Sequence, residues 1–231
     1  MRGETFRQGF QAAIPTALGY ISISMACGII SASYIQPMEM ILMSLFVYAG
    51  SAQFAILTLI GAQAPVTAIA LTVFLINLRH FLLGLHTSTF FRTSSLWKNI
   101  GIGTFLTDET YGVLMSEHIH TKDITPQWMY GNILTSYFAW LLGTILGVAF
   151  GSFLPNPESF GLDFALLGMF IGIFSSQFLV MLEKIALKKI LTVLIAVAVS
   201  FFCLASVLSQ SLAVLVATLI GCTVGVMVDE Q

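Results

Sequence analysis

Long apolar runs, separated by short polar connections, make up most of the chain. A membrane-spanning helix needs about 20 consecutive apolar residues, and the runs of that length lie at about 9–32, 38–60, 65–90, 129–152, 160–182, 188–208 and 211–228. An eighth run, at about 100–118, is interrupted by Asp108, Glu109 and Glu117. The pattern predicts an all-α polytopic integral membrane protein with about 7–8 transmembrane or re-entrant helical segments.

The composition agrees with this fold class. Of the 231 residues, 57% are hydrophobic and 9% are charged, whereas about a quarter of the residues in a soluble domain are charged. The connections are too short to hold a soluble domain, so we expect one transmembrane domain over residues 1–231, surrounded by the lipid bilayer. A net charge of −2 without a basic face excludes nucleic acid as a partner.

The distribution of basic residues leaves two topologies open. The three lysines of the 183–189 connection place it, and the C-terminus, on the cytoplasmic side. If 100–118 spans, the N-terminus is inside and Arg92 and Lys98 are outside; if 100–118 is re-entrant, the N-terminus is outside. Each arrangement leaves six basic residues inside and two outside. We favour eight segments with an internal N-terminus, because the first helix often dominates orientation.

Two similar stretches indicate an internal repeat. "YAGSAQFAI" at 48–56 resembles "GIFSSQFLV" at 172–180, and a glycine precedes each at a similar distance. A duplicated unit, with possible halves at 1–120 and 128–231, accounts for both. Transporters are often built from such repeats, with the binding site near the membrane midplane at the repeat interface.

The first cluster of candidate pathway residues lies in these two stretches. Gly50, Ser51 and Gln53 occupy the first, and Ser176 and Gln177 occupy the matching positions of the second. A Gly-Ser pair permits a kink or an unwound turn, whose carbonyl and amide groups can hold a zwitterion. The alternative is close helix packing by small residues, with Gln53 hydrogen-bonded across an interface.

The second cluster is "NLRH", which puts Asn77, Arg79 and His80 inside an apolar run. A guanidinium at the bilayer centre costs about 2.5–3.5 kcal/mol on insertion scales, so Arg79 needs a partner. Asp108, Glu109, a substrate carboxylate or water could serve. Three interpretations stay open: a functional site, a structural ion pair, and an arginine that reaches a nearby membrane face.

Asp108, Glu109 and His80 are candidates for proton coupling. A carboxyl group in apolar surroundings is pushed towards its neutral form and can bind a proton near the working pH, and histidine titrates near neutral pH. His80 can equally be a structural hydrogen-bonding residue. Since adjacent residues cannot share one helical face, we expect at most one of Asp108 and Glu109 to face a pathway.

Other motifs argue against catalysis. His118 and His120, next to Glu117, lack further ligands at metal-binding spacing and are interpreted as a solvated loop. The small residues of "GTILGVAFG", at 143–151, predict a tight helix contact within the fold or with a partner. The chain has no Walker loop, nucleophile elbow or zinc-protease motif. We therefore expect no enzyme activity, no cofactor and no metal site.

Four ordered motifs, "GFQAAIPTALGY", "VYAGSAQF", "INLRHFLLG" and "FLTDETYG", resemble those of the AzlC family, the large subunits of bacterial branched-chain amino acid exporters. The similarity runs from Gly9 to about Gly225. The resemblance implies export of branched-chain amino acids, the bacterial cytoplasmic (inner) membrane, and a small hydrophobic membrane partner of the AzlD type. By motif match, it adds Tyr48 and Tyr111 to the candidate residues.

These interpretations together predict a secondary transporter subunit. We expect Arg79 or a helix N-terminus to hold the substrate carboxylate, Gln53 and unwound carbonyl groups to hold its ammonium group, and proton exchange to supply the energy. Two other classes stay open: a non-transporting membrane scaffold or assembly subunit, and a channel for small solutes.

Overall fold

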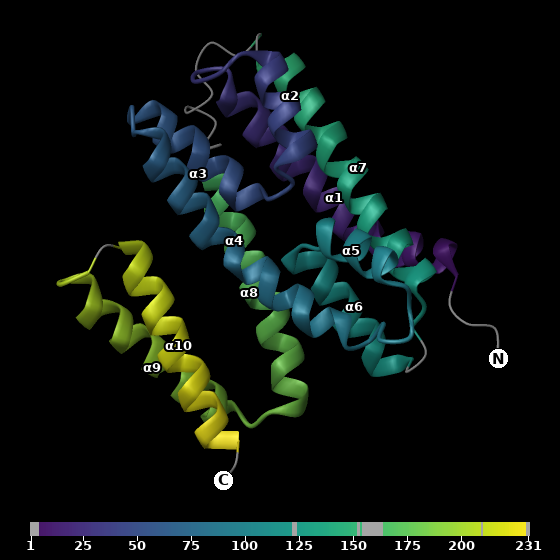
Figure 1. Ribbon diagram of the computed structural model, residues 1–231, viewed down its shortest axis with the longest axis vertical. Helices are drawn as coiled ribbons and strands as arrows, with labels where there is room; N and C mark the ends of the chain where they lie inside the picture. The colour runs from purple at the N-terminus through teal and green to yellow at the C-terminus, as the bar shows by residue number, and fades with distance from the viewer. Residues whose placement is uncertain (1–4, 122–123, 152, 154–163, 209, 230–231) are drawn as a thin grey trace. The chain divides into compact units, whose positions relative to one another are not determined.

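The computed structural model describes residues 5–121, 124–151, 153, 164–208 and 210–229. These residues form helices and no strand (Figure 1), which confirms the predicted all-α class. Contacts within the chain divide it into two compact units, residues 1–173 and residues 174–231.

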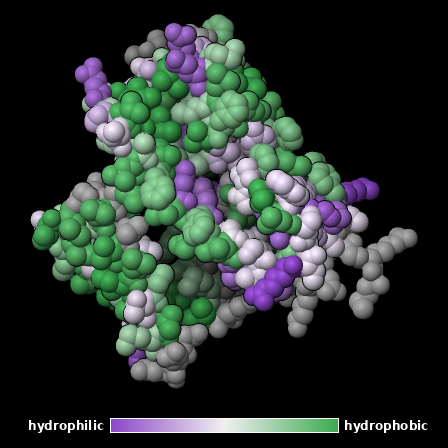
Figure 2. Space-filling view, viewed as in Figure 1, coloured by the Kyte–Doolittle hydropathy of each residue, from purple (hydrophilic) through white to green (hydrophobic). Residues whose placement is uncertain are grey.

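Four helices of the described residues are long and apolar enough to cross a membrane. They are α1 (Phe6–Ser31), α4 (Val66–Ser88), α7 (Pro126–Gly151) and α9 (Leu187–Ala205). Large apolar side chains stay exposed, and Figure 2 shows hydrophobic residues over most of the visible face. Such a surface suits lipid and not water, so the predicted membrane location is confirmed.

In the first unit, α1 and α7 lie side by side and run in the same direction (Figure 1). Glycines let the two backbones approach closely: a Cβ at Gly28 would lie 2.6 Å from the carbonyl oxygen of Thr144, and one at Gly147 would lie 2.8 Å from the carbonyl carbon of Met25. The other two glycines of the 143–151 ladder face α1 in the same way. The ladder therefore makes its tight contact within the fold.

The run predicted to span the membrane at 38–60 is not one helix. It forms two short helices, α2 (Pro37–Phe46) and α3 (Gly50–Gly61), joined by a non-helical turn. The pair folds back on itself, because a Cβ at Gly61, the last residue of α3, would meet the ring of Tyr34, just before α2 begins. Both ends of this pair therefore lie at the same end of the first unit.

Side chains replace the backbone hydrogen bonds that a continuous helix would make at 47–49. The amide of Gln53 donates to the carbonyl of Val47 at 2.7 Å, and the hydroxyl of Tyr137 donates to the carbonyl of Leu45 at 3.1 Å. A carbonyl that has lost its helical partner costs free energy in a membrane unless another donor reaches it. One of these donors comes from α7, so the break depends on tertiary packing.

The weak run at 100–118 also forms two helices, α5 (Leu96–Thr104) and α6 (Asp108–His120), separated by a short turn. This pair folds back as well. Near the end of α6, the ring of His118 packs against Phe90, with 4.7 Å between the ring centroids, and Phe90 lies in the connection between α4 and α5. Of the two interpretations of this run, the structure agrees with the re-entrant one.

Local sequence explains where α6 begins. The backbone N–H of Thr107 donates to the hydroxyl of Thr110 at 2.9 Å, and the N–H of Thr110 donates to the hydroxyl of Thr107 at 3.3 Å. Asp108 and Glu109 then occupy the first turn, where the helix dipole stabilises negative charge. A threonine followed by two acids is a helix-start signal, so this break could have been found in the sequence.

One end of the first unit gathers the start of α1, the start of α5 and the start of α7. The hydroxyl of Tyr130 donates to the carbonyl of Lys98 at 2.9 Å, and a Cβ at Gly131 would lie 2.8 Å from the backbone nitrogen of Phe10. Both sequence-based topologies placed the N-terminus and Lys98 on opposite sides of the membrane. The structure contradicts both, because they count 38–60 as a crossing and the chain instead turns back there.

The second unit contains α9 and α10 (Gln210–Asp229), which pack against each other, and most of α8 (Ala165–Lys184). Ser176 and Gln177 lie on α8, which runs without the break seen between α2 and α3. Their side chains lie outside the described residues. Their predicted role and the repeat halves therefore stay predictions.

Candidate functional site

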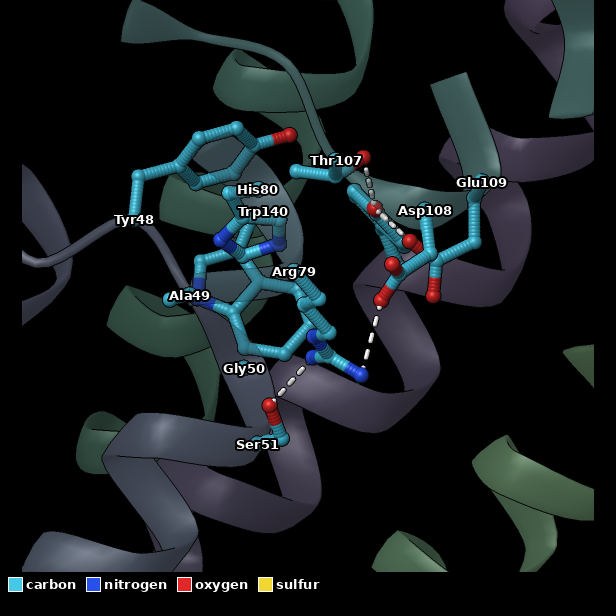
Figure 3. A pocket seen from close by; sticks show the side chains of 11 residues that line it. Tyr48, Ala49, Gly50, Ser51, Arg79, His80, Thr107, Asp108, Glu109 and Trp140 are labelled. Atoms are coloured by element: carbon cyan, nitrogen blue, oxygen red, sulfur yellow. Dashed lines mark hydrogen bonds and ion pairs between the residues drawn. The ribbon is translucent and has the colours of Figure 1, made fainter. Parts of the chain in front are cut away.

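Both short-helix pairs turn at the same place in the first unit, and a cavity lies between the two turns (Figure 3). The elements around it are far apart in the sequence: α1, the two turns, the first residues of α3 and α6, the middle of α4, and α7. The lining residues are Tyr20, Tyr48, Ala49, Gly50, Ser51, Arg79, His80, Thr107, Asp108, Glu109 and Trp140.

Two helix N-termini meet at the cavity. Helix α3 begins at Gly50 without a side-chain cap from Ala49, and α6 begins at Asp108. The unpaired N–H groups and the dipole of a helix start favour an anion there. At Gly50, a Cβ would run into the ring of Trp140, so a residue without a Cβ lets α3 start this close to the cavity wall.

Arg79 bridges the two turns. Its Nη1 lies 2.9 Å from Oδ2 of Asp108, and its Nη2 donates to the hydroxyl of Ser51 at 2.5 Å, as Figure 3 shows. The sequence left Asp108 and Glu109 as equal candidates for the ion pair, and the structure pairs Arg79 with Asp108. Their side chains are 32% and 14% exposed, so the pair lies at the cavity and is not sealed in an apolar core.

Glu109 has a different partner. The hydroxyl of Tyr20 donates to Oε2 of Glu109 at 2.5 Å. The same phenol oxygen lies 2.7 Å from the hydroxyl of Thr107, which must donate because the single phenol hydrogen is already used. The three side chains form a hydrogen-bonded line from Thr107 through Tyr20 to Glu109.

Both acidic residues line the cavity, although the sequence predicted that at most one of them would face it. The prediction assumed a pathway along the side of a helix, where adjacent residues point in different directions. The cavity lies instead at the start of α6, and Asp108 and Glu109 are the first two residues of that helix. Consecutive side chains can both reach a space at the end of a helix.

Gln53 does not line the cavity. Its side chain is fully buried, its amide nitrogen donates to Val47, and its amide oxygen accepts from the indole N–H of Trp140 at 3.1 Å. The ring of Trp140 in turn packs edge-to-face on Tyr20, with 5.2 Å between centroids. Gln53 therefore holds the turn before α3 and one wall of the cavity in place.

Other predicted residues divide between the cavity and its surroundings. Tyr48 and His80 line it, whereas Asn77 and Tyr111 do not. The hydroxyl of Tyr111 lies 2.9 Å from Nδ1 of His86, further along α4. Sequence reasoning missed Tyr20 and Trp140, since an isolated aromatic residue in an apolar run carries no signal that separates a cavity wall from ordinary packing.

The cavity is small. Its volume is about 20 Å³, which is room for roughly one water molecule. Binding sites for small molecules are much larger, at roughly 300–1,000 Å³. An amino acid could enter only if the two turns moved apart.

The AzlC protein family model matches residues 15–154 of this chain. Relatives include the Escherichia coli K12 inner membrane protein YgaZ, 27% identical over 75% of this chain and 74% of its own length. The Bacillus subtilis branched-chain amino acid transport protein AzlC is 29% identical over 75% of this chain and 68% of its own length. No solved structure matches the chain. The family model covers more than half of the sequence and every residue that lines the cavity, and the chain belongs to the AzlC family.

Proposed function

We propose that the chain is the substrate-binding subunit of a secondary transporter that exports branched-chain amino acids from the cytoplasm in exchange for protons, together with a small AzlD-type membrane partner. The observation that carries the proposal is the Arg79–Asp108 ion pair, held at a cavity between two helix N-termini. The name of the Bacillus subtilis relative supports the substrate class.

A zwitterion can replace both halves of this ion pair. The substrate carboxylate binds Arg79 and the N-terminus of α3, and the substrate ammonium group forms an ion pair with Asp108. The net charge of the site is then the same with and without substrate. A substrate with a single charge would leave one residue of the pair without a counter-charge, which is costly at membrane depth. The pair therefore favours α-amino acids.

Aromatic rings supply the apolar side of the cavity. The ring of Tyr20 packs against Trp140 and, at 6.4 Å between centroids, against Tyr48. Apolar ring faces next to a few polar groups are typical of sites that bind hydrophobic ligands. This wall supports an aliphatic amino acid side chain over a polar one.

The carboxylates supply the coupling. A protonated Asp108 or Glu109 cannot hold an ammonium group, so a proton and the substrate exclude each other at the same residue. Two ligands that weaken each other's binding are thermodynamically coupled, and intramembrane carboxyl groups serve as proton carriers in many transporters. Mutual exclusion favours exchange: protons move inwards as amino acids move outwards.

The two helix pairs supply the gates. The α2–α3 pair enters from one end of the first unit and the α5–α6 pair from the other, and their turns meet at the cavity. Moving one pair at a time would open the site to one side of the membrane at a time, which is the requirement of alternating access.

Efflux from cells loaded with a leucine-containing dipeptide tests the proposal. The chain would be expressed with its small partner, unchanged or as Arg79→Ala, with Arg92→Ala as a matched control outside the cavity. Losing a charge-assisted contact should lower leucine efflux by about 100-fold in Arg79→Ala. The control should stay within about twofold, since exposed charges contribute little.

Other outcomes point elsewhere. Unchanged efflux in Arg79→Ala at matched membrane levels would return the ion pair to a structural role and favour the scaffold or channel class. Equal efflux rates with and without a pH gradient, at clamped voltage, would contradict proton coupling but not the transporter function.

A further inference from the structure

A second cavity lies between α4 and α5, closer to the end of the first unit where Lys98 lies. Its volume is about 10 Å³, room for roughly one water molecule. The lining residues are Gly84, Thr87, Ser88, Phe91, Asn99, Ile102 and Gly103. None of these seven side chains is ionisable.

Two polar atoms at this cavity have no hydrogen-bond partner among the described residues. They are the hydroxyl oxygen of Thr87, a residue that is 1% exposed, and the side-chain oxygen of Asn99. Buried polar atoms are normally satisfied by protein groups or by buried water. A space of this size between two such atoms is therefore a site for water.

Thr87 continues a line of residues that starts at the central cavity. Asn77, His80, Gly84 and Thr87 recur every three or four residues and so share one face of α4. The step from His80 to Thr87 is about 10 Å along the helix axis. Between them, a Cβ at Gly84 would meet no atom within 4 Å. On the other side of His80, away from Thr87, the side-chain oxygen of Asn77 is also buried without a hydrogen-bond partner among the described residues.

The line joins two regions of different chemistry. At its inner end, His80 lines the central cavity with both carboxylates. The ionisable groups that face His80 there are Arg79, Asp108, Glu109, Tyr20 and Tyr48. At its outer end, Asn99 follows Lys98 in the first turn of α5 and donates to the carbonyl of Phe91 at 3.2 Å.

We propose that this face of α4, with Asn99, holds a file of water molecules that conducts protons between the central carboxylates and the basic end of the first unit. The inference rests on the proposed proton coupling and adds a separate route for the proton. Each water or hydroxyl accepts one proton and passes on another, so no group is consumed. The amino acid, in contrast, passes between the turns of the helix pairs.

The test uses the chain and its partner in proteoliposomes, with two readouts. One is leucine efflux driven by a pH gradient. The other is counterflow of labelled against unlabelled leucine at equal pH, which needs no net proton movement. The variants are Gly84→Val, which fills the file, and Thr87→Val, which removes its hydroxyl. Three variants serve as controls. Gly112→Val also has open space around its Cβ position, and Thr89→Val changes an exposed residue at the end of α4. Thr87→Ser keeps the hydroxyl group.

Gly84→Val and Thr87→Val should lose about tenfold of the driven efflux and keep counterflow within about twofold of the unchanged protein. The three controls should keep both. An equal loss of both activities would place these residues in the substrate route or the fold and overturn the file. Unchanged driven efflux in both variants would also overturn it. If the unchanged protein shows no pH-driven efflux, that result contradicts the proposed proton coupling. It then also overturns the water file, which rests on that coupling.

Discussion

At the scale of single residues, the ion pair accounts for a guanidinium inside an apolar helix. Arg79 is neutralised by Asp108 and hydrogen-bonded to Ser51, so its charge is compensated at membrane depth. The same bonds connect α4 to the starts of α3 and α6. One side chain thus links three elements, and a substrate that bound Arg79 in place of these partners would release both bonds together.

Tyr20→Phe should change the pH dependence of efflux. The phenol donates to Glu109 and stabilises its charged form. Without that donor, Glu109 holds a proton to higher pH, and the proton competes with the substrate over a wider range. The pH of half-maximal efflux should therefore rise.

Measuring efflux against pH in Tyr20→Phe and in Tyr130→Phe checks this shift. Tyr130 donates to a backbone carbonyl far from the cavity, so its variant should keep the original midpoint. An unmoved midpoint in Tyr20→Phe would remove Glu109 from the proton-binding step.

At the scale of elements, glycines decide how closely α1 and α7 pack. The two helices carry much of the core of the first unit, including Trp128 and Trp140, which are 1% and 2% exposed. Apolar burial against lipid provides little driving force, so van der Waals contact between close backbones holds such a pair together. A methyl group at this interface has no room.

Gly28→Ala should therefore destabilise the folded protein, and Gly19→Ala should not. A Cβ at Gly28 would lie 2.6 Å from a backbone oxygen of α7, whereas one at Gly19 would meet nothing within 4 Å. Overpacking costs about 1–3 kcal/mol, and alanine in an open helix position gains up to about 1 kcal/mol over glycine.

Thermal unfolding of the two purified variants compares these effects within one helix. The melting temperature should fall for Gly28→Ala and hold or rise for Gly19→Ala. Equal melting temperatures would mean that α1 and α7 do not pack this closely in the membrane.

At the scale of the whole molecule, the two folded-back helix pairs place the charged residues of the first unit at other ends than the sequence-based topologies did. Among the described residues of the first unit, α1, α4 and α7 are the helices long and apolar enough to cross a membrane, and Arg7, Arg92 and Lys98 lie at one end of this unit. Glu39 lies at the other end, at the start of α2. Under the positive-inside rule, we expect the basic end to face the cytoplasm, with the N-terminus inside, as favoured from the sequence.

Labelling of single cysteines in intact cells with a membrane-impermeant maleimide tests this arrangement. In a background with Cys203 and Cys222 replaced by serine, Gln63→Cys should react from outside. Ser95→Cys and Thr121→Cys should both stay protected until the cells are permeabilised, because the start of α5 and the end of α6 lie on the same side of the membrane. Opposite accessibility of Ser95→Cys and Thr121→Cys would mean that the α5–α6 pair crosses the membrane.

The sequence by itself determined that this is a helical membrane protein, because long apolar runs and sparse charge leave no other stable environment. It also located most of the polar cavity residues, such as Arg79 and Asp108, because a charged side chain at membrane depth is costly unless it is paired or functional. Only the tertiary structure decided that the 38–60 run breaks at 47–49 and which carboxylate pairs with which partner. Glu109 meets Tyr20, 89 positions away, and Gln53 meets Trp140, 87 positions away. Bonds of that range leave no periodic trace in the sequence, since they form only after packing brings distant helices together.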